Sequence, residues 1–327
     1  MADVIVQKAL LYRYSIPLKN YMPQRDGLVI ELIDDSARSY FAEAAPLTGR
    51  SKESIEKVER EIKNLLPLVL GKSVSTLMGL TLSDTSLAAS VSFALFGALH
   101  QMLYPYKEIS CPISALLMGS YDKIKEDLHR RRDLGMTHVK LKTSNLSPAE
   151  AKKIVAELMG RYTLRIDLNR SWSASEVREF FSCYENDVFD YVEEPGLCDI
   201  AHPIALDETL VAEKTNEALM RPNVKALVIK PTILGMGPSV HSLIDWGRKN
   251  KKTLSLSSSF ETGLGLYQIA LAARFFDIDS APLGLDTYRY LTFDILQNRH
   301  MIKEGKMYFS APHIDRSLID KGVLCLI

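Results

Sequence analysis

The sequence predicts an α/β protein with a (β/α)8-type, TIM-like barrel that follows an α+β capping domain. Two observations predict the barrel. From about Ser110 onward, short apolar runs alternate with helical segments in units of about 20–30 residues. Several of these runs end in a charged residue, and barrel active sites lie at the carboxyl ends of the strands. A doubly wound open sheet is the competing architecture, but no G-x-G-x-x-G or G-K-[ST] motif follows the first predicted strand.

The chain is expected to divide into two domains. Residues 1–108 would form the capping domain, rejoined by the tail 299–327, and residues 109–298 would form the barrel. Strands and helices do not alternate regularly in the first hundred residues, which separates that part from the barrel. Residues 85–104 carry no formal charge, but they include histidine and glutamine and predict a packed helix rather than a membrane span.

Local signals define the individual elements. Apolar runs bounded by turn residues predict strands, and amphipathic segments predict helices. Ser147 followed by Pro148 is typical of a helix start, and Gly135 of a helix end. The predicted strands are residues 9–17 and 27–35 in the capping domain and 112–119, 137–142, 163–169, 189–195, 203–208, 224–231, 253–259 and 280–287 in the barrel. The predicted helices are residues 54–70, 86–103, 121–135, 147–160, 173–184, 210–219, 238–250 and 263–276.

Charge and cysteine content bound the possible functions. Lys+Arg and Asp+Glu both number 40, so the formal net charge is 0 and nothing favours nucleic-acid binding. The four cysteines form no C-x-x-C pair and are interpreted as free thiols in a reducing compartment. The N-terminus lacks the pattern of a signal peptide. We expect a cytoplasmic protein without a nucleic-acid or membrane partner, and the sequence leaves its oligomeric state open.

Lysines end two of the predicted strands. Lys140 and Lys142 are two residues apart on one strand, so both point to the same face. Two ammonium groups so close disfavour each other's charge, which would lower the pKa of one of them and suit a general base. Lys230 ends the sixth strand, nearly across a barrel from the second, where its amine could act as the other acid or base or stabilise negative charge.

Carboxylates end the three strands between these lysines. Asp167, Glu193 and Asp207 would converge in a barrel, and three carboxylate oxygens suit Mg²⁺ with positions left for water and substrate. No histidine or cysteine accompanies them, which argues against zinc or copper. Glu194 competes with Glu193 for the ligand role, because alternation puts the two side chains on opposite faces. Glu208 similarly neighbours Asp207.

The seventh strand runs into a loop rich in serine and glycine. Ser257, Ser258 and Ser259 are followed by Gly263 and Gly265 at the start of a predicted helix. Hydroxyls and free backbone N–H groups before a helix suit an anionic ligand. An ordinary loop is the alternative interpretation.

Together these residues predict removal of a proton next to a carboxylate group. A small-molecule carboxylate substrate would bind Mg²⁺ through its oxygens, and Lys142 would remove the α-proton while the metal stabilises the enediolate. Schiff-base chemistry at Lys142 or Lys230 is a second class, although it does not need three carboxylates. A non-catalytic barrel is a third class, which the six charged residues together disfavour.

The ordered set K-x-K, Asp, Glu, Asp, Lys on successive strands resembles the enolase superfamily, in its muconate-lactonising-enzyme subgroup. Within that subgroup the chain is similar to the o-succinylbenzoate synthase family. The matching segments are RIDLNRSW, YVEEP, ALDETL, VIKPTILG, SSSFETGLGL and PLGLDT.

This resemblance implies a modified (β/α)7β barrel and a lyase reaction of menaquinone biosynthesis. The substrate 2-succinyl-6-hydroxy-2,4-cyclohexadiene-1-carboxylate would lose water to give o-succinylbenzoate. Lys142 would remove the α-proton and return it to the departing hydroxyl, and Lys230 would stabilise the enediolate by a cation–π contact. The implied ligands of Mg²⁺, with Mn²⁺ as a substitute, are Asp167, Glu193 and Asp207. The implied substrate-binding residues are Lys140, Arg165, Ser257, Ser258 and Gly284.

Three features depart from this family or bear on its specificity. The stretch GMGPSV after Lys230 differs from the run of small residues expected there. Dipeptide epimerases and N-succinylamino acid racemases use the same lysines and metal site, and are the alternative. The epimerases carry D-x-D near the eighth strand; we interpret Asp277 and Asp279 as a helix-to-strand turn instead. The loop 20–26 would cap the site and contribute to specificity.

Overall fold

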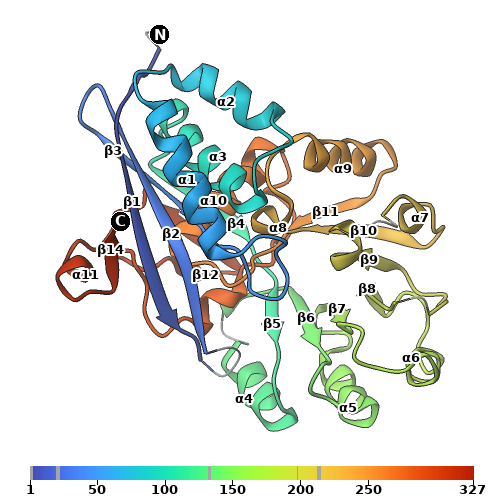
Figure 1. Cartoon of the computed structure of the whole chain (residues 1–327). Helices are drawn as coiled ribbons and strands as arrows, with labels where there is room; N and C mark the ends of the chain where they lie inside the picture. Colours follow the sequence, from blue (N-terminus) through green and yellow to red (C-terminus); the bar gives the residue numbers. More distant parts are fainter. Residues whose placement is uncertain (1–2, 20–22, 132–133, 197, 212–214) are drawn as a thin grey trace.

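The computed structural model describes residues 3–19, 23–131, 134–196, 198–211 and 215–327. Its N-terminal part is built on an antiparallel sheet in the order β14-β1-β2-β3, with the last strand of the chain at one edge (Figure 1). Three helices follow β3, and β3 and α3 make extensive contacts. The elements are β1 (Val6–Pro17), β2 (Gln24–Asp34), β3 (Ser39–Ala44), α1 (Ile55–Val69), α2 (Val74–Ser83), α3 (Ala89–Leu103) and β14 (Leu324–Leu326).

The second part is a curled parallel sheet, as the fold class predicted. Seven strands run in the order β11-β10-β9-β8-β7-β6-β5, so neighbours in the chain are neighbours in the sheet. The strands are β5 (Ala115–Leu117), β6 (His138–Lys142), β7 (Thr163–Asp167), β8 (Phe189–Glu193), β9 (Ile204–Leu206), β10 (Val224–Ile229) and β11 (Thr253–Leu256). The helices that follow these strands in the chain are α4 (Tyr121–Arg131), α5 (Pro148–Leu158), α6 (Ala174–Phe181), η2 (Glu208–Val211), α7 (Thr215–Leu219), α8 (Pro231–Leu234), α9 (Pro238–Lys249) and α10 (Gly263–Phe275).

The eighth predicted strand closes the barrel through only a few residues. Leu283 bridges to Ile113 and Gly284 bridges to Ser257, both in the parallel sense. The next element, η3 (Asp286–Tyr290), adds a side-chain contact between this segment and the first barrel strand. The carboxylate of Asp286 accepts from the backbone N–H of Leu116 at 2.9 Å. The seam between the first and last strands is therefore held partly by a side-chain hydrogen bond.

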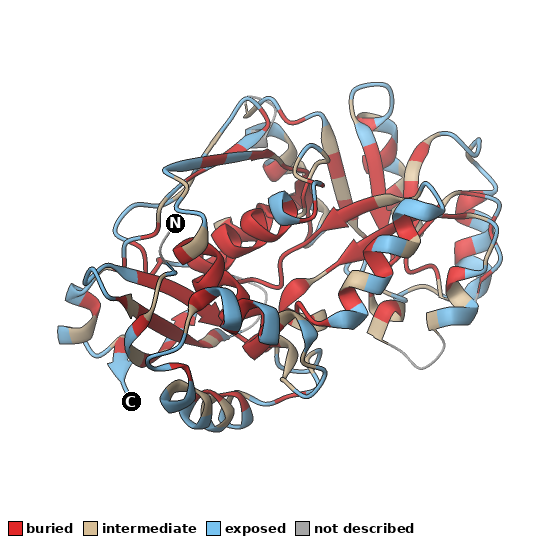
Figure 2. Cartoon of the chain, turned by 90° about the horizontal axis from the view of Figure 1, so that it is seen from above, coloured by how far each residue is buried: buried red, intermediate tan, exposed pale blue. Residues whose placement is uncertain are grey.

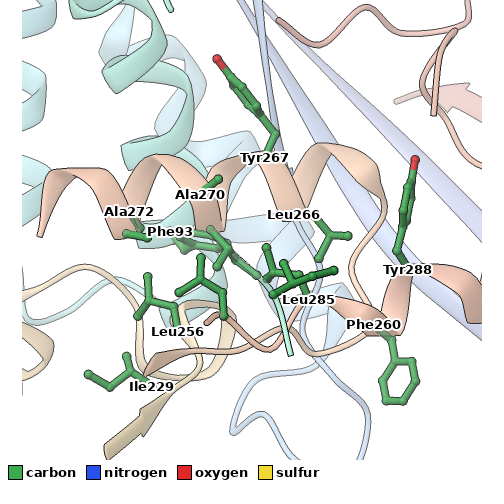
Figure 3. Close-up of a cluster of buried hydrophobic side chains, with 14 of the residues drawn as sticks. Phe93, Ile229, Leu256, Phe260, Leu266, Tyr267, Ala270, Ala272, Leu285 and Tyr288 are labelled. Atoms are coloured by element: carbon green, nitrogen blue, oxygen red, sulfur yellow. The ribbon is translucent and has the colours of Figure 1, made fainter. Parts of the chain in front are cut away.

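Helix α10 lies between the capping part and the barrel, and most of its residues are buried. Figure 3 shows Phe93 of α3 beside Leu266 and Ala270 of α10, with Leu256 and Ile229 of the barrel below them. Figure 2 shows that buried residues lie along the sheets and central helices, whereas exposed residues lie on the outer helices. One continuous apolar core thus joins the two parts.

Several local predictions are confirmed and some elements were missed. Ser147 caps α5 in a capping box with Glu150, with proline at the start of the helix. The predicted helix 210–219 is instead η2 and α7, with residues 212–214 outside the described part. The short β3 and the uncharged α2 were not predicted. Within the described residues, no helix combines the length and apolar character needed to cross a membrane.

The C-terminal tail pairs with strands in two different sheets. Its hairpin pairs with β4 (Glu108–Pro112), at the junction between the two parts of the chain. Its last strand pairs with β1. The remaining tail elements are β12 (Met301–Lys303), β13 (Lys306–Ser310) and α11 (Ser317–Asp320).

Candidate active site

The charged residues at the strand ends lie close together, and all of them except the fully buried Asp167 line one pocket of the barrel. Strand pairing sets this arrangement: Lys142 lies beside Asp167, and Asp167 lies beside Glu193. Asp207 and Lys230 follow directly after β9 and β10 and line the same pocket. Side chains that the sequence scatters over ninety residues therefore meet at the carboxyl ends of five adjacent strands.

Lysine amines lie between the carboxylates. The Nζ of Lys140 is 2.5 Å from Glu193 Oε1 and 3.0 Å from Asp167 Oδ2. The Nζ of Lys142 is 3.4 Å from the same oxygen of Asp167. Lys230 pairs with Asp207. The pocket is thus a network of paired opposite charges, and all of these side chains are largely removed from water.

The pKa values reflect this pairing. Burial lowers the pKa of the Lys140 amine, but Asp167 and Glu193 outweigh it and hold that pKa well above its ordinary value. Lys140 is therefore not the lysine of the pair to which the predicted lowering of the pKa applies. Burial also lowers the pKa of Lys230, but the charge of Asp207 outweighs it, so that pKa is likewise raised. Burial raises the pKa of Asp167, but the charges of Lys140 and Lys142 reverse this and hold it below its usual range.

Glu193 and Glu194 occupy different environments. Glu193 is the last residue of β8 and points to Lys140. Glu194 has a positive φ of 47°, and its Oε1 accepts from the backbone N–H groups of Asp207 and Thr209, each at 2.8 Å. Its other oxygen accepts from Arg170 at 2.7 Å. Glu194 thereby fixes the turn after β9, while Glu193 faces the pocket.

The carboxylates fit a divalent cation in their chemistry. Among the described residues, no group of three or more His, Cys, Asp or Glu side chains is already spaced to hold a metal ion, because the amines separate them. Yet Glu193 Oε2 is buried without a hydrogen-bond partner. Burial, and then the charge of Asp167, raises the pKa of Glu193 to about 8. The unpartnered oxygen of Glu193 is thus available to a cation, and hard oxygen donors suit Mg²⁺.

The predicted substrate-binding residues line the pocket but are partly engaged by the protein. Ser258 donates to the carbonyl of Gly284 at 2.8 Å, and Ser257 lies beside the same residue. A side chain at Gly284 would meet the Ser257 hydroxyl at 2.5 Å, so glycine is needed for this close approach. Arg165 also lines the pocket, but its Nε donates to Asp190 at 2.9 Å and its guanidinium lies over Tyr191.

The prediction that the start of α10 binds an anionic ligand is wrong. The N–H groups of Thr262 and Gly265 donate to the carboxylate of Glu43, at 3.2 and 2.9 Å. The N–H of Gly263 donates to Asp294 at 3.1 Å. A carboxylate of the capping part therefore already occupies the position that an external anion would take.

A loop that the sequence did not indicate reaches the pocket. Residues 20–22 of the expected capping loop lie outside the described residues, and its described residues 23–26 do not line the pocket. Leu47 and Arg50, in the loop between β3 and α1, do line it. The sequence did not indicate Leu47 and Arg50, because only the folded chain brings that loop to the strand ends. It also did not single out the lining residues Asn169 and Asp286. For Asn169 and Asp286 the sequence held one usable signal: they lie in the matching segments RIDLNRSW and PLGLDT, next to residues that the sequence did single out.

The two aspartates that resembled D-x-D lie elsewhere. Asp277 follows the C-cap of α10 with a positive φ of 49°, and Asp279 pairs with Arg274 at 3.9 Å. Neither lines the pocket. They form the predicted helix-to-strand turn.

Known structures share this architecture over nearly the whole chain. A member of the enolase superfamily from Roseovarius nubinhibens superposes with a TM-score of 0.76 at 17% identity, covering 99% of this chain and 96% of the other. The fold is that of the enolase superfamily. Muconate lactonizing enzyme from Pseudomonas putida matches with a TM-score of 0.76 at 16% identity, covering 98% and 100% of the two chains. A dipeptide epimerase from Cytophaga hutchinsonii, complexed with Mg and the dipeptide D-Ala-L-Val, matches with a TM-score of 0.79 at 17% identity, covering 99% of each chain.

Several curated proteins with similar sequences are named o-succinylbenzoate synthase. The o-succinylbenzoate synthase of Pasteurella multocida is 26% identical over 320 residues, covering 90% of this chain and 93% of that protein. The o-succinylbenzoate synthase of Aliivibrio fischeri is 29% identical over 307 residues, covering 86% and 90%. No protein-family model matches the chain. The sequence similarity is thus modest in identity but extends over nearly the full length.

Proposed function

We propose that the protein is an o-succinylbenzoate synthase, a lyase that removes water from 2-succinyl-6-hydroxy-2,4-cyclohexadiene-1-carboxylate in menaquinone biosynthesis. The observation that carries the proposal is the meeting of lysine amines with three strand-end carboxylates: Glu193 and Asp207 line the pocket, and the fully buried Asp167 pairs with its lysines. The relatives named o-succinylbenzoate synthase support the choice of reaction. Such an enzyme would act in the cytoplasm, as the sequence predicts.

Asp167, Glu193 and Asp207 would hold Mg²⁺, with Mn²⁺ as a substitute. The metal would supply positive charge next to the substrate carboxylate, which makes the neighbouring C–H bond more acidic. Lys140, whose amine lies between Asp167 and Glu193, would hold these two carboxylates in position and balance their charge.

The reaction would then use the pocket lysines for proton transfer. The Nζ of Lys142, as the free amine, would take the proton from the carbon that bears the carboxylate, and the electron pair of that C–H bond would pass into an enediolate. The same amine, now protonated, would give its proton to the ring hydroxyl, which departs as water while the ring becomes aromatic. Lys230 would face the ring and stabilise the negative charge and the π-system.

The remaining pocket residues would orient the substrate. Ser257, Ser258 and Gly284 form one wall, where the succinyl arm would lie. Arg165 would help to position Lys140, because these two residues lie opposite each other on paired strands and Asp190 holds the Arg165 side chain in place.

The test is turnover by the purified protein. We expect it to form o-succinylbenzoate from the cyclohexadiene carboxylate when Mg²⁺ is present, and to lose this activity with EDTA. The dipeptide epimerase or N-succinylamino acid racemase alternative is favoured by the fold shared with the Cytophaga enzyme. Failure to form o-succinylbenzoate, together with epimerisation of dipeptides or N-succinylamino acids, would overturn the proposal in favour of that alternative.

A further inference from the structure

One cation of the pocket comes from the capping part of the chain. Arg50 lies in the loop between β3 and α1 and lines the pocket together with Leu47. Its Nη1 is 3.1 Å from Oε1 of Glu208, the residue after Asp207. The side chain of Arg50 is still 48% exposed. A guanidinium carries five N–H donors, so this contact leaves capacity for another anion.

The loop that carries Arg50 is held in a defined shape. The guanidinium of Arg25, on β2, is buried and donates to the carbonyl of Pro46 at 2.7 Å and to that of Ala45. The Ser51 hydroxyl accepts from the backbone N–H of Leu47 at 2.9 Å. The backbone N–H of Arg50 closes a turn onto the carbonyl of Leu47, also at 2.9 Å. Arg50 is therefore presented by a pre-formed turn rather than by a loop that must be ordered on binding.

Three other cations of the pocket are more deeply engaged. Lys140 lies between two carboxylates, and Lys230 pairs with Asp207. Arg165 is bound to Asp190, with its side chain only 4% exposed. Arg50 differs from these three in its exposure and in its place on the capping part of the chain.

One oxygen of the acidic residue of the eighth-strand wall is engaged by the protein. Asp286 accepts from the N–H of Leu116 at 2.9 Å and lies 3.8 Å from the guanidinium of Arg289. It is only 1% exposed. Asp286 is thus almost fully buried beside the cationic Arg289, which disfavours an ammonium group there, whereas an anionic group would find the half-exposed Arg50.

We propose that Arg50 binds a second carboxylate of the substrate, remote from the one at the reacting carbon, and thereby selects dicarboxylates over substrates with an ammonium or an uncharged arm. This inference rests on the proposed function and deepens it, because it names the residue that binds the succinyl carboxylate. A bidentate contact between a guanidinium and a carboxylate has the geometry for such selection.

Ligand binding tests this inference without relying on turnover. Calorimetry with Mg²⁺ present would compare o-succinylbenzoate with 2-butanoylbenzoate, in which a methyl group replaces the succinyl carboxylate. The wild-type protein should bind the dicarboxylate about 10- to 100-fold more tightly. Arg50→Met should remove this preference and leave the affinity for 2-butanoylbenzoate unchanged, while Arg50→Lys should retain part of it.

Lys52→Met is the matched control, because Lys52 lies in the same loop, is exposed and does not line the pocket. It should bind both ligands as the wild type does. An Arg50→Met protein that keeps the full preference overturns the inference, as does a wild-type protein without a preference. Failure of the proposed function has a different signature, since the wild type would then form no o-succinylbenzoate from the cyclohexadiene carboxylate whatever its binding preference.

Discussion

Two buried carboxylates in this protein have opposite kinds of surroundings. Glu43, at the interface between the capping part and α10, accepts from the Tyr14 hydroxyl at 2.6 Å and from the N–H groups of Thr262 and Gly265. Glu193, in the pocket, meets the Lys140 amine with one oxygen and no hydrogen-bond donor with the other. Both are 1% exposed. One is fully satisfied by neutral donors, and the other is not.

The pKa values of the two groups express the same difference. Burial is the largest cause in both cases and raises both pKa values. For Glu43 the next cause is a hydrogen bond from Thr262, which counteracts burial; for Glu193 it is the charge of Asp167, which adds to burial. The interface thus uses its polar groups for structure, whereas the pocket leaves a buried carboxylate oxygen without a protein partner, as a ligand site requires.

The largest expected effect is on catalysis at Lys142. We expect Lys142→Ala to lower the rate of o-succinylbenzoate formation by about 100- to 10,000-fold, because it removes the general base. The midpoint of urea denaturation should change little, since Asp167 keeps Lys140 as a partner. Steady-state kinetics and urea denaturation measure the two quantities, and unchanged turnover would remove Lys142 from the base role.

Glu193→Gln should separate activity from stability. We expect turnover to fall by about 100-fold or more, because a ligand charge is lost. The metal-free protein should be at least as stable as the wild type, since the substitution relieves repulsion with Asp167. Glu194→Gln is the matched control: it should destabilise the protein, because Glu194 accepts from Asp207, Thr209 and Arg170. Equal effects of the two substitutions on stability would erase the distinction drawn between these neighbours.

The interface should show the reverse behaviour. Glu43→Ala leaves the Tyr14 hydroxyl and two helix N–H groups without their acceptor, so we expect a loss of roughly 4 kcal/mol in the free energy of unfolding. Under conditions where the variant is folded, turnover should stay within a few-fold of the wild-type rate. A stable but inactive Glu43→Ala protein would show that the interface carries more than structure.

His100 provides a smaller, pH-dependent test of the same interface. Burial lowers its pKa from 6.5 to about 4, so the unfolded chain takes up this proton before the folded chain does. Stability contributed by neutral His100 is thus present above pH 6.5 and is lost as the pH falls toward 4, by about 2 kcal/mol at pH 5. His100→Phe keeps the ring among Phe96, Tyr104 and Phe275 and should reduce this loss. Denaturation at pH 7 and pH 5 compares the two proteins, and identical pH dependence would contradict the assignment.

The sequence predicted the part of the site that lies within repeating units. Lys142, Asp167 and Lys230 each come at the end of an apolar run, and the barrel brings such ends together. It could not predict Glu43 at the start of α10, because that contact joins residues 219 apart and depends on how the two parts of the chain dock. Arg50 was missed for the same reason. The choice between Glu193 and Glu194 needed the backbone, since the positive φ at Glu194 breaks the strand alternation.

Mg²⁺ binding tests the central difference between the two regions most directly. Calorimetric titration of Mg²⁺ into metal-free protein should detect binding in the wild type and in Glu43→Ala, measured where that variant is folded. In Glu193→Gln the affinity should fall by about 100-fold or more, because a direct ligand matters at least as much as the groups that orient it. Wild-type affinity in Glu193→Gln, or loss of binding in folded Glu43→Ala, would contradict the account.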